Sequence, residues 1–580
     1  MTSYKAPLQD YKFLLDDVFS VGDLLTCEAF SHVAPDVIEA VLEEAAKLCE
    51  GVLLPLNQVG DKEGCRFHEG KVTTAPGFPA AHRQVAEGGW LGLTGDPEYG
   101  GQGLPHFVGN LVEEMMCSTN LAYAMYRGLT EGACRLLGAY ASAELKDTYI
   151  PRLLSGEWLP TMNLTEPHCG SDLGLLRSKA VPAPDGSYRI TGTKIFISGG
   201  EQDLTDNIIH LVLARLPDAP AGTRGISVFL VPKKLPDAAG KFVLPNQLSC
   251  GGIEHKMGMK GSATCLMNFE EATGFMVGPE NSGLKAMFTM MNAARLAVSV
   301  QGVAIGEAAL QIATAYAAER RQGRAAGTAI DHSVAADTID QHPDVKRMLL
   351  TQRAYTEGGR ALSVMLGRAL DLSHVSADAK VREAADDMVQ LLTPVAKSML
   401  TECGFDAANL GIQILGGHGY ISEWGIEQLA RDVRVSMIYE GTNGIQAGDL
   451  AGRKLHLFDG RLQARFFADI ETFLETISGH KVLAPLARRL ALALNGLRGC
   501  TDLIMGKTKT DPAGVAAVAS DFLRQFGLVT LGYLWLRMAL AAGDKDEIFY
   551  CQKIETARFF ITRLLTQTLG LEASIQNVLT

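Results

Sequence analysis

Apolar residues recur every three or four positions soon after the start of the chain. Between residues 35 and 48 they stand at Val37, Ile38, Val41, Leu42, Ala45 and Leu48. This spacing places them on one face of a helix, and Pro35 suits the first turn of that helix. Helical patterns return from about residue 106 to residue 154. The first 34 residues form a mixed arm, whose aromatic and leucine content predicts that it packs on another part of the protein.

The pattern changes near residue 159 from helical spacing to alternating or continuous apolar runs. These runs are rich in β-branched residues and read LPTMNLT, SYRITGTKIFIS, NIIHLVLARL and GISVFLVP. The tripeptide Pro-Asp-Gly at 184–186 is typical of a hairpin turn. Residues 159–275 are therefore expected to form an antiparallel β domain.

Helical spacing resumes near residue 281 and continues to the end. Helices are expected near 282–320, 344–371, 376–403, 405–415, 425–434 and 443–456, with long amphipathic helices after 460. Short loops between long helices predict an antiparallel bundle. Because helices precede and follow one β region, the pattern indicates a mostly helical α+β fold rather than alternating βαβ units. The expected divisions are an arm (1–34), a helical domain (35–158), a β domain (159–278), a helical bundle (279–456) and a helical extension (457–580).

Composition and charge narrow the class of protein. The 580 residues are 47% hydrophobic and 20% charged, which excludes a largely disordered chain. The formal net charge of −12 argues against nucleic acid or an anionic membrane as the main partner. The apolar run nearest to a membrane span, 526–538, is too short and contains Arg537. The 11 cysteines show no CxxC pair and no zinc spacing, and the N-terminus has no signal segment, which together predict reduced thiols, no metal site and a cytoplasmic location.

Glycine-rich stretches at 100–103 and 416–419 lack the βαβ context of a dinucleotide site. Two other segments could still contact a ligand. The segment 163–174 (NLTEPHCGSDLG) offers backbone N–H groups and hydroxyls that could hold a polar ring or a phosphate, and a tight β turn is the simpler alternative. The segment 414–420 (ILGGHGY) has two glycines that let backbone approach a ligand. Its alternative is a helix end followed by a loop in which His418 is hydrogen-bonded.

A third segment, RDVRVSMIYEGTNGIQ at 431–446, contains a candidate base. Glu440 lies between an apolar run and Gly-Thr-Asn, at a junction between two expected helices. Burial in an apolar cavity would raise the pKa of this carboxyl and make it a usable base near neutral pH. The alternative is that Glu440 caps the helix that starts near Thr442.

Four motifs together resemble the acyl-CoA dehydrogenase flavoprotein family. They are TEPHCGSD (165–172), KIFISGG (194–200), QILGGHGY (413–420) and IYEGTN (438–443), in the family's order and at about its spacing. The resemblance covers roughly residues 35–455 and implies an N-terminal helical domain, a middle β domain and a four-helix bundle, with FAD between the last two. The arm and the helices beyond 456 are similar to a longer subgroup that includes bacterial 3-methylmercaptopropionyl-CoA dehydrogenases.

The resemblance also implies roles for individual residues. Glu440 matches the catalytic base. The positions that match FAD contacts are Leu164, Thr165, Ser171, Phe196, Ser198, Arg320, Gln413, Gly416, Gly417 and Thr442. The positions that match substrate contacts are Ser171, Arg295 and Tyr439. Arg321 is an alternative to Arg320. Phe196 stands where many relatives have tryptophan, Asn292 replaces a frequent aspartate, and Gly444 replaces a frequent glutamine.

The reaction implied by the resemblance is α,β-dehydrogenation of a short or medium acyl-CoA, with 3-methylmercaptopropionyl-CoA as one candidate. Glu440 would remove the α-proton while a hydride passes to the flavin, and the Glu440 N–H would stabilise the thioester oxygen. Electron-transfer flavoprotein would then accept the electrons. A homodimer is implied, in which the loop with Gln413, Gly416 and Gly417 receives the FAD of the partner subunit.

Several alternatives stay open on the sequence. A helix around residues 120–127 would reach the acyl tail, yet Tyr123, Met125 and Tyr126 fit a core equally well. The substrate could be a straight-chain fatty acyl-CoA of medium or long chain. Oxygen in place of a protein acceptor would make the enzyme an acyl-CoA oxidase. A DNA-binding or regulatory flavoprotein would need a basic surface, against which the acidic net charge counts.

Overall fold

The structure is a computed structural model that describes residues 4–327 and 332–580. The chain divides into two compact units. The first unit comprises residues 1–46, 105–118 and 298–580, and the second comprises residues 47–104 and 119–297. Helices α6 (His106–Arg127) and α9 (Gly283–Glu319) contribute residues to both units.

The second unit is built around a seven-stranded sheet, as far as its residues are described, with the order β3-β6-β7-β11-β5-β4 and β10 beside β11. The strands are β3 (Trp158–Asn163), β4 (Lys179–Pro182), β5 (Tyr188–Ser198), β6 (Asn207–Ala214), β7 (Ser227–Pro232), β10 (Leu248–Ile253) and β11 (Thr264–Val277). Separate hairpins pair β1 (Arg66–His68) with β2 (Lys71–Thr73), and β8 (Lys234–Pro236) with β9 (Phe242–Pro245). The predicted β region is confirmed, and its Pro-Asp-Gly turn joins β4 to β5 with Gly186 at φ +82°.

One strand pair departs from the predicted antiparallel arrangement. β3 and β6 pair in parallel, with Trp158 opposite Asn207 and Asn163 opposite Val212. Parallel neighbours need a long connection that returns the chain to the same end of the sheet. Residues 164–206 supply this connection, because they contain β4 and β5. The expectation of a wholly antiparallel domain is therefore wrong at this edge.

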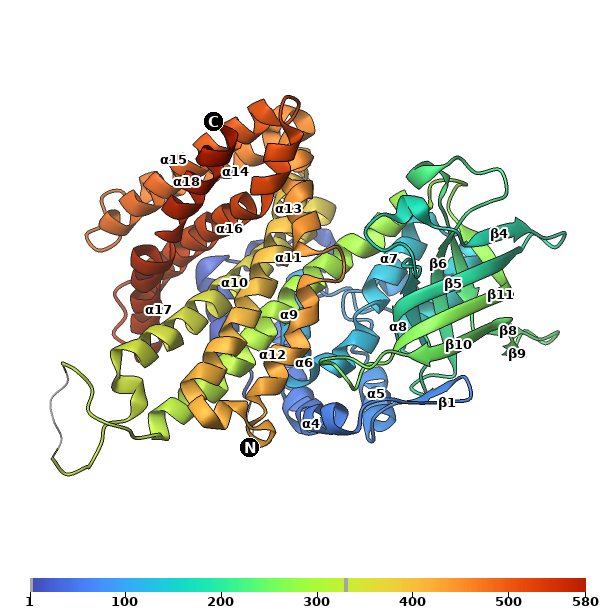
Figure 1. Cartoon of the computed structure of the whole chain (residues 1–580), viewed down its shortest axis with the longest axis horizontal. Helices are drawn as coiled ribbons and strands as arrows, with labels where there is room; N and C mark the ends of the chain where they lie inside the picture. Colours follow the sequence, from blue (N-terminus) through green and yellow to red (C-terminus); the bar gives the residue numbers. More distant parts are fainter. Residues whose placement is uncertain (1–3, 328–331) are drawn as a thin grey trace. The chain divides into compact units, whose positions relative to one another are not determined.

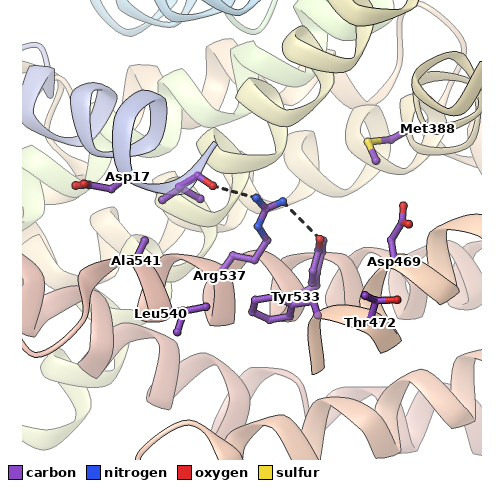
Figure 2. Close-up of a pocket in the computed structure, with 10 residues that line it drawn as sticks. Asp17, Met388, Asp469, Thr472, Tyr533, Arg537, Leu540 and Ala541 are labelled. Carbon is purple, nitrogen blue, oxygen red and sulfur yellow. Dashed lines mark hydrogen bonds between the residues drawn. The ribbon is translucent and has the colours of Figure 1, made fainter. Parts of the chain in front are cut away.

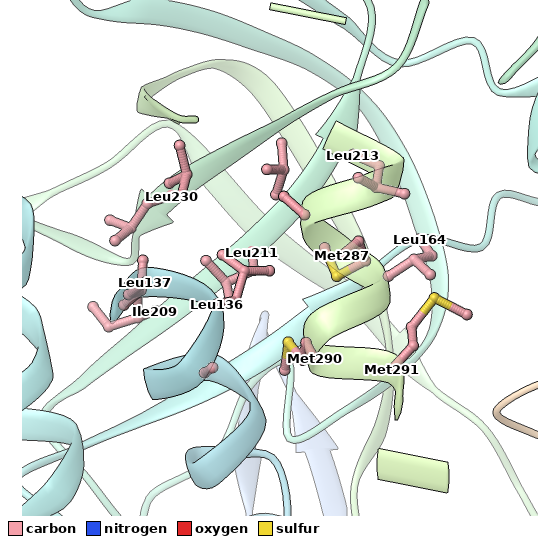
Figure 3. Packing of buried hydrophobic residues seen from close by; sticks show 14 of the residues in the cluster. Leu136, Leu137, Leu164, Ile209, Leu211, Leu213, Leu230, Met287, Met290 and Met291 are labelled. Atoms are coloured by element: carbon pink, nitrogen blue, oxygen red, sulfur yellow. The ribbon is translucent and has the colours of Figure 1, made fainter. Parts of the chain in front are cut away.

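Helices of the second unit pack on this sheet and bury its core (Figure 3). These helices are α7 (Thr130–Tyr140), α8 (Ala143–Leu154) and the first turns of α9, while α4 (Leu54–Glu63) and α5 (Phe78–Glu87) also belong to the second unit. Leu136 and Leu137 of α7 and Met287 and Met290 of α9 point toward Leu211 of β6, and all five side chains are buried. Because unbranched methionine adapts to irregular gaps, α9 follows the twisted sheet closely here.

The first unit is helical. Its arm and entry helices are α1 (Leu8–Lys12), α2 (Gly22–Leu25) and α3 (Pro35–Leu48), and its central helices are α10 (Pro343–Val375), α11 (Ala379–Leu415), α12 (Ile426–Val433) and α13 (Asn443–Gly452). The extension contains α14 (Arg461–Thr476), α15 (Ala484–Lys507), α16 (Pro512–Ala542), α17 (Ile548–Phe559) and α18 (Gln567–Leu579). In Figure 1, α10 and α11 lie side by side and α16 packs against both. The predicted helices of the bundle and of the extension are confirmed.

Two predicted helix boundaries are wrong. The helices expected at 376–403 and 405–415 form one continuous helix, α11. Gly404, at the expected break, lies so close to α9 that a Cβ there would be 2.3 Å from the Gly302 carbonyl oxygen. The glycine therefore allows close helix packing instead of ending the helix. The helix expected at 443–456 ends at Gly452 and is followed by a 3₁₀ segment, Lys454–Gly460.

The arm packs inside the first unit, as its apolar residues predicted. A π-helical turn, Phe13–Val18, continues α1, and Tyr11, Phe13 and Leu14 are buried. The Phe13 ring meets the Phe549 ring of α17 edge to face, with centroids 5.5 Å apart. The arm therefore shares a core with the C-terminal extension.

A buried network of charges also joins the arm to the helices of this unit. Arg360 of α10, 1% exposed, pairs with Asp10 of the arm, with Glu114 at 2.6 Å and with Glu307 at 2.6 Å. Lys553 of α17 pairs with the same Asp10 and, at 2.8 Å, with Glu357 of α10, which Arg353 approaches at 3.5 Å. We call these side chains the ion cluster. Asp10 pairs with both buried cations, so it links the arm to α10 and to α17.

Two of the described helices, α9 and α16, are long and apolar enough to cross a membrane by length and composition. In each, 83% of the apolar window is buried inside the structure. The sequence argument considered only the second of these regions.

Candidate active site

The loop after β3 carries Leu164 and Thr165. The fully buried Lys194 of β5 donates to the Leu164 carbonyl at 3.1 Å and to the Glu166 carboxylate at 2.9 Å. The Ile195 N–H donates to the Thr165 carbonyl at 2.9 Å. The first and second sequence motifs are thus held together by direct hydrogen bonds within the second unit.

Glu166 anchors the same loop through a buried network. Its carboxylate accepts hydrogen bonds from the Ser178 hydroxyl at 2.6 Å and from the Arg177 N–H at 2.8 Å. Burial raises the pKa of Glu166, but the Lys194 charge and these hydrogen bonds outweigh that effect and lower the pKa below its ordinary value. Burial lowers the pKa of Lys194 to about 8. Glu166 and Cys169 exchange backbone hydrogen bonds, so the tight turn considered as an alternative is present.

Phe196 of β5 combines two unusual features. Its backbone is left-handed, with φ +59°, and its side chain is 59% exposed. A left-handed conformation costs a bulky residue roughly 1–2 kcal/mol, and an exposed ring recovers little by burial. Strain of this kind concentrates at sites where a ligand is held. The ring is therefore available to stack on a planar ligand.

The turn after Phe196 is held from the start of β11. The Gly199 N–H donates to the Ala263 carbonyl at 2.9 Å, and the Ala263 N–H donates to the Tyr126 hydroxyl at 2.7 Å. The Glu201 N–H donates to Cys265 Sγ at 3.3 Å. Gly199 has φ +63°, and a Cβ there would lie 3.3 Å from the Tyr126 ring. These contacts fix the backbone that presents Ser198.

Three predicted hydroxyls of the second unit, on Thr165, Ser171 and Ser198, form no hydrogen bond with any residue that the structure describes. Their donor and acceptor capacity is therefore available to a ligand. Arg295 of α9 donates to Asn292 Oδ1 at 3.3 Å and lies over the Phe288 ring at 6.0 Å.

The predicted base, Glu440, lies in the first unit on a loop between two helices. Glu440 and Gly441 are consecutive left-handed residues, with φ +55° and +81°. Gln446 Nε2 donates to the Glu440 carbonyl at 3.1 Å, and the Lys397 ammonium donates to the Gly441 carbonyl at 2.9 Å. We call residues 440–442 the base loop. A half-buried glutamate in a strained and pinned conformation is typical of a functional position.

The capping alternative for Glu440 is wrong. Helix α13 begins at Asn443, and its N-cap is Thr442, whose hydroxyl accepts a hydrogen bond from the Ile445 N–H at 3.2 Å. Next to Glu440, the Tyr439 hydroxyl donates to the Gln301 side-chain oxygen. Burial raises the pKa of Tyr439 well above its usual range, so the phenol stays protonated and keeps this hydrogen bond.

The segment 413–417 is a helix end followed by a loop, which was the alternative to a ligand-binding loop. Gly416 ends α11 with φ +60°. The loop also keeps the open backbone that a ligand needs, because a Cβ at Gly416 or Gly417 would meet no atom within 4 Å. Gln413 is exposed beside them. His418 is hydrogen-bonded, as its alternative stated, with Nδ1 2.9 Å from the Tyr316 hydroxyl.

The two candidate arginines differ in their contacts. Arg321 donates to the Ala336 carbonyl at 3.1 Å. Arg320 is exposed, and its side chain has no ion pair among the residues that the structure describes. Arg320 is therefore the better placed of the two to bind an anion.

The helix expected to reach the acyl tail is buried in the second unit at all three of its named residues, Tyr123, Met125 and Tyr126. Tyr123 is fully buried with its hydroxyl 3.3 Å from His82 Nδ1. Tyr126, 3% exposed, supports the Ser198 turn. The core alternative is therefore correct for all three side chains.

A groove of about 600 Å³ in the first unit lies apart from these residues. Its walls come from the arm and from α11, α14 and α16 (Figure 2). Arg537 donates to the Val18 carbonyl at 2.9 Å and to the Tyr533 hydroxyl at 3.4 Å, so its charge is used to attach the arm. Among the described residues, the groove's lining contains no member of the predicted site.

Sequence reasoning missed the residues that support the site. Lys194, Lys397, Gln446 and Tyr126 hold site backbone in place. Lys194 and Gln446 stand in segments quoted above and Tyr126 was considered for the acyl pocket, but no pattern in the sequence indicated this supporting role for any of the four. Lys194 alone could have been suspected, because a lysine inside an apolar strand needs a buried partner.

Matches to known sequence families cover nearly all of the chain. The N-terminal domain of acyl-CoA dehydrogenase matches residues 36–157, the middle domain 161–272 and the C-terminal domain 281–455. A domain described as acetyl-CoA dehydrogenase C-terminal like matches residues 466–579. The chain is also 42% identical over 573 residues to 3-methylmercaptopropionyl-CoA dehydrogenase of Ruegeria pomeroyi, covering 97% of this chain and 96% of the relative.

The chain belongs to the acyl-CoA dehydrogenase family. It is 34% identical to a butyryl-CoA dehydrogenase of Syntrophomonas wolfei, over 98% of this chain and 96% of that one. Its fold matches the crystal structure of an acyl-CoA dehydrogenase complexed with FAD from Bacillus anthracis, with a TM-score of 0.78 and 20% identity. That match covers 98% of this chain and 92% of the other, so an acyl-CoA dehydrogenase fold with a C-terminal extension is confirmed.

Proposed function

We propose that this protein is an FAD-dependent enzyme that introduces an α,β double bond into a short acyl-CoA thioester. The observation that carries the proposal is the conformation of the base loop. Glu440 holds a left-handed backbone at φ +55°, and Thr442 caps α13, so the Glu440 carboxylate is not used as the cap of that helix. Family membership supplies the reaction class in which a glutamate at this position acts.

The residues of the predicted cofactor site fit FAD. The second unit offers the exposed Phe196 ring for the flavin and three hydroxyls without protein partners, on Thr165, Ser171 and Ser198. The first unit offers Arg320 for a phosphate and the open backbone of the 416–417 loop. These are the donor and stacking groups that a flavin dinucleotide requires.

Bound FAD, held by residues such as Phe196 and Ser198, would supply the oxidising chemistry at the β-carbon. The protein carries out the other half of the reaction. Glu440 takes the α-proton, and its own N–H donates to the thioester oxygen as negative charge develops there. Arg295 holds an anionic part of the CoA moiety, and Tyr439 contacts the substrate next to the base. Holding donor and acceptor in fixed geometry removes much of the entropy cost of the reaction.

The proposed substrate is 3-methylmercaptopropionyl-CoA. The support is the 42% identity over almost the whole length to an enzyme named for that substrate. A straight-chain short acyl-CoA is the second candidate, supported by the 34% identical butyryl-CoA dehydrogenase. Electron-transfer flavoprotein as acceptor and a homodimeric assembly complete the proposal.

An anaerobic visible spectrum of the purified holoenzyme tests the reaction class and the substrate together. We expect loss of the oxidised-flavin band on adding 3-methylmercaptopropionyl-CoA, and slower or weaker bleaching with butyryl-CoA and octanoyl-CoA. Faster bleaching by butyryl-CoA would replace the proposed substrate with the straight-chain one. Rapid recovery of the band in air without an added acceptor would indicate an acyl-CoA oxidase, and a yellow protein that no thioester bleaches would contradict the proposal.

Replacing the base tests the assigned mechanism. Glu440→Gln should lower the rate of flavin bleaching by roughly 10²–10⁴-fold, the usual contribution of a general base. FAD content and thioester binding should stay unchanged, because the amide keeps the shape of the side chain. Glu427→Gln, a carboxyl of α12 paired with Arg431, is the control and should bleach normally. Near-normal turnover by Glu440→Gln would remove Glu440 as the base.

A further inference from the structure

A buried lysine beside the base loop has a geometry that suits a role in catalysis. Lys397 lies in α11, is fully buried, and directs two of its three donors at the segment that follows Glu440. One donor reaches the Gly441 carbonyl oxygen at 2.9 Å, and the other reaches Asn443 Oδ1 at 2.9 Å. The ammonium therefore joins the base loop to the first residue of α13.

Asn443 extends this attachment to a second point on α11. Its amide nitrogen lies 3.3 Å from the Ser398 carbonyl and 3.1 Å from a Glu402 carboxylate oxygen. Lys397, Ser398 and Glu402 all belong to α11, so a rigid helix sets the start of α13 and the Gly441 carbonyl together. Gln446, from the next turn of α13, holds the Glu440 carbonyl at 3.1 Å.

These contacts explain how two consecutive left-handed residues persist. The Glu440 carbonyl accepts a hydrogen bond from Gln446, and the Gly441 carbonyl accepts one from Lys397. Without those donors the loop would relax toward ordinary right-handed or extended backbone, and the Glu440 side chain would change direction. A displacement of about 1 Å at a reacting group is enough to cost 10²-fold in rate.

We propose that Lys397 is a positioning residue for Glu440. Lys397 holds the base loop in its reactive conformation and favours the ionised form of Glu440. This inference rests on the proposed function, in which Glu440 removes the α-proton. Lys397 does not contact the reacting atoms itself. Its hydrogen bond to the Gly441 carbonyl fixes the loop, and its buried positive charge, held at the residue that follows Glu440, would stabilise the carboxylate.

Other titratable groups also face this loop and are the same in every variant proposed below. Tyr439 precedes Glu440, and Cys117 and Glu113 of α6 are close enough to Tyr439 to raise its pKa. Glu402 contacts Asn443 and pairs with Arg524 of α16 at 3.2 Å. A change seen on replacing Lys397 alone is therefore assigned to Lys397.

Two substitutions separate the hydrogen bond from the charge. Lys397→Met removes both, and Lys397→Gln keeps an N–H donor without the charge. The control is Lys553→Met, which removes a buried lysine that pairs with Asp10 and Glu357 of the same unit instead of the base loop. Each holoenzyme is assayed for FAD content, for kcat and KM across pH, and for amide hydrogen exchange over residues 438–446.

We expect Lys397→Met to lose at least 10-fold in kcat with little change in KM, and to exchange the 438–446 amides faster. The acid limb of its pH profile should move up by about one unit, because the base loses a stabilising charge. Lys397→Gln should recover most of the kcat at pH values above the acid limb. Its acid limb should stay at the same raised pH as in Lys397→Met, because the charge is still missing. Lys553→Met should leave both the pH limb and the exchange of this segment as in the native enzyme.

Unchanged amide exchange over 438–446 in Lys397→Met would overturn the proposal, whatever the activity. An unshifted acid limb in both Lys397 variants would overturn its electrostatic half. If the native enzyme bleaches with no thioester, the proposed function fails, and the exchange experiment still decides whether Lys397 holds the base loop.

Discussion

At the scale of single residues, the candidate site is marked by backbone strain. Phe196 and Glu440, two of the residues assigned by resemblance, both have left-handed backbone without being glycine. The support for this strain comes from neighbours that make strong hydrogen bonds, such as Lys397 on the Gly441 carbonyl. Seven other described non-glycine residues also have positive φ, so the strain supports the roles that the resemblance gives to these two residues and does not assign those roles by itself.

Phe196 gives a direct test of this view. Phe196→Gly should raise the free energy of unfolding of the FAD-free protein by roughly 1 kcal/mol, because glycine adopts φ +59° without strain and the ring is mostly exposed. The same change should weaken FAD binding, because the stacking ring is lost. Urea unfolding of the apoprotein and FAD titration measure the two effects.

Phe196→Ala is the matched variant, since it removes the ring and keeps the strained backbone. It should weaken FAD binding to a similar extent without stabilising the apoprotein. A loss of apoprotein stability in Phe196→Gly would show that the ring belongs to the fold.

At the scale of elements, the turn at 198–201 depends on a helix far away in the sequence. The Tyr126 hydroxyl of α6 accepts from the Ala263 N–H at 2.7 Å and donates to the Gly261 carbonyl at 3.2 Å. Ala263 in turn accepts from the Gly199 N–H. The turn that presents Ser198 is thus only as rigid as the connection between β10 and β11.

Tyr126→Phe should therefore destabilise the second unit and loosen the cofactor site. Removing the hydroxyl leaves the buried Ala263 N–H without its partner, at an expected cost of about 1–3 kcal/mol. FAD affinity should fall in the same variant, because the Ser198 turn loses its support. Urea unfolding followed by circular dichroism, together with FAD titration, checks both outcomes.

Tyr123→Phe provides the comparison on the same helix, because its hydroxyl meets only the His82 ring, at 3.3 Å, among the contacts that the structure gives it. It should cost less and should leave FAD affinity unchanged. Equal effects of the two substitutions on FAD affinity would contradict the proposed link from Tyr126 to Ser198.

At the scale of the molecule, the ion cluster ties the arm to the bundle and the extension of the first unit. Its four carboxylates, Asp10, Glu114, Glu307 and Glu357, face three cations, Arg353, Arg360 and Lys553. Burial, reinforced by the charges of Glu307 and Asp10 and opposed by Arg360, raises the pKa of Glu114 to about 7. A cluster with one carboxylate in excess favours binding of a proton.

This proton has a predictable effect on stability. Between the ordinary pKa of 4.5 and about 7, the folded protein holds the Glu114 proton and the unfolded chain does not. Protonation of Glu114 therefore adds to the free energy of unfolding, and this addition is fully present below pH 4.5. It is lost as pH rises through 7, and the total loss is about 3 kcal/mol. Glu114→Gln should abolish this loss, so its advantage over the native protein should grow from pH 5 to pH 8.

Unfolding midpoints in urea at pH 5 and pH 8 for both proteins measure this difference. Burial lowers the pKa of His210 to about 3, so the contribution of His210 to the free energy of unfolding rises with pH in an overlapping range. This contribution is the same in both proteins and cancels when they are compared. Glu475→Gln, an exposed carboxyl of α14, is the control and should show no such trend. A variant whose midpoint tracks the native protein at both pH values would show that Glu114 is ionised throughout.

The sequence by itself determined the order of helices and strands, the Pro-Asp-Gly hairpin and the motif residues of the site, because each follows from local periodicity, turn chemistry or residue identity. Its prediction of a helix break at Gly404 and its prediction that the β domain is wholly antiparallel are wrong. Both depend on contacts that are not local, namely the packing of Gly404 against Gly302 and the parallel pairing of β3 with β6 after a long connection. The sequence also left open whether Glu440 was a cap or a base, whether His418 and Tyr126 served the fold, and which arginine met the cofactor. Only the tertiary structure decided or narrowed these questions. The reason is that hydrogen bonds between residues far apart in the sequence determine which side chains are used by the fold and which can contact a ligand.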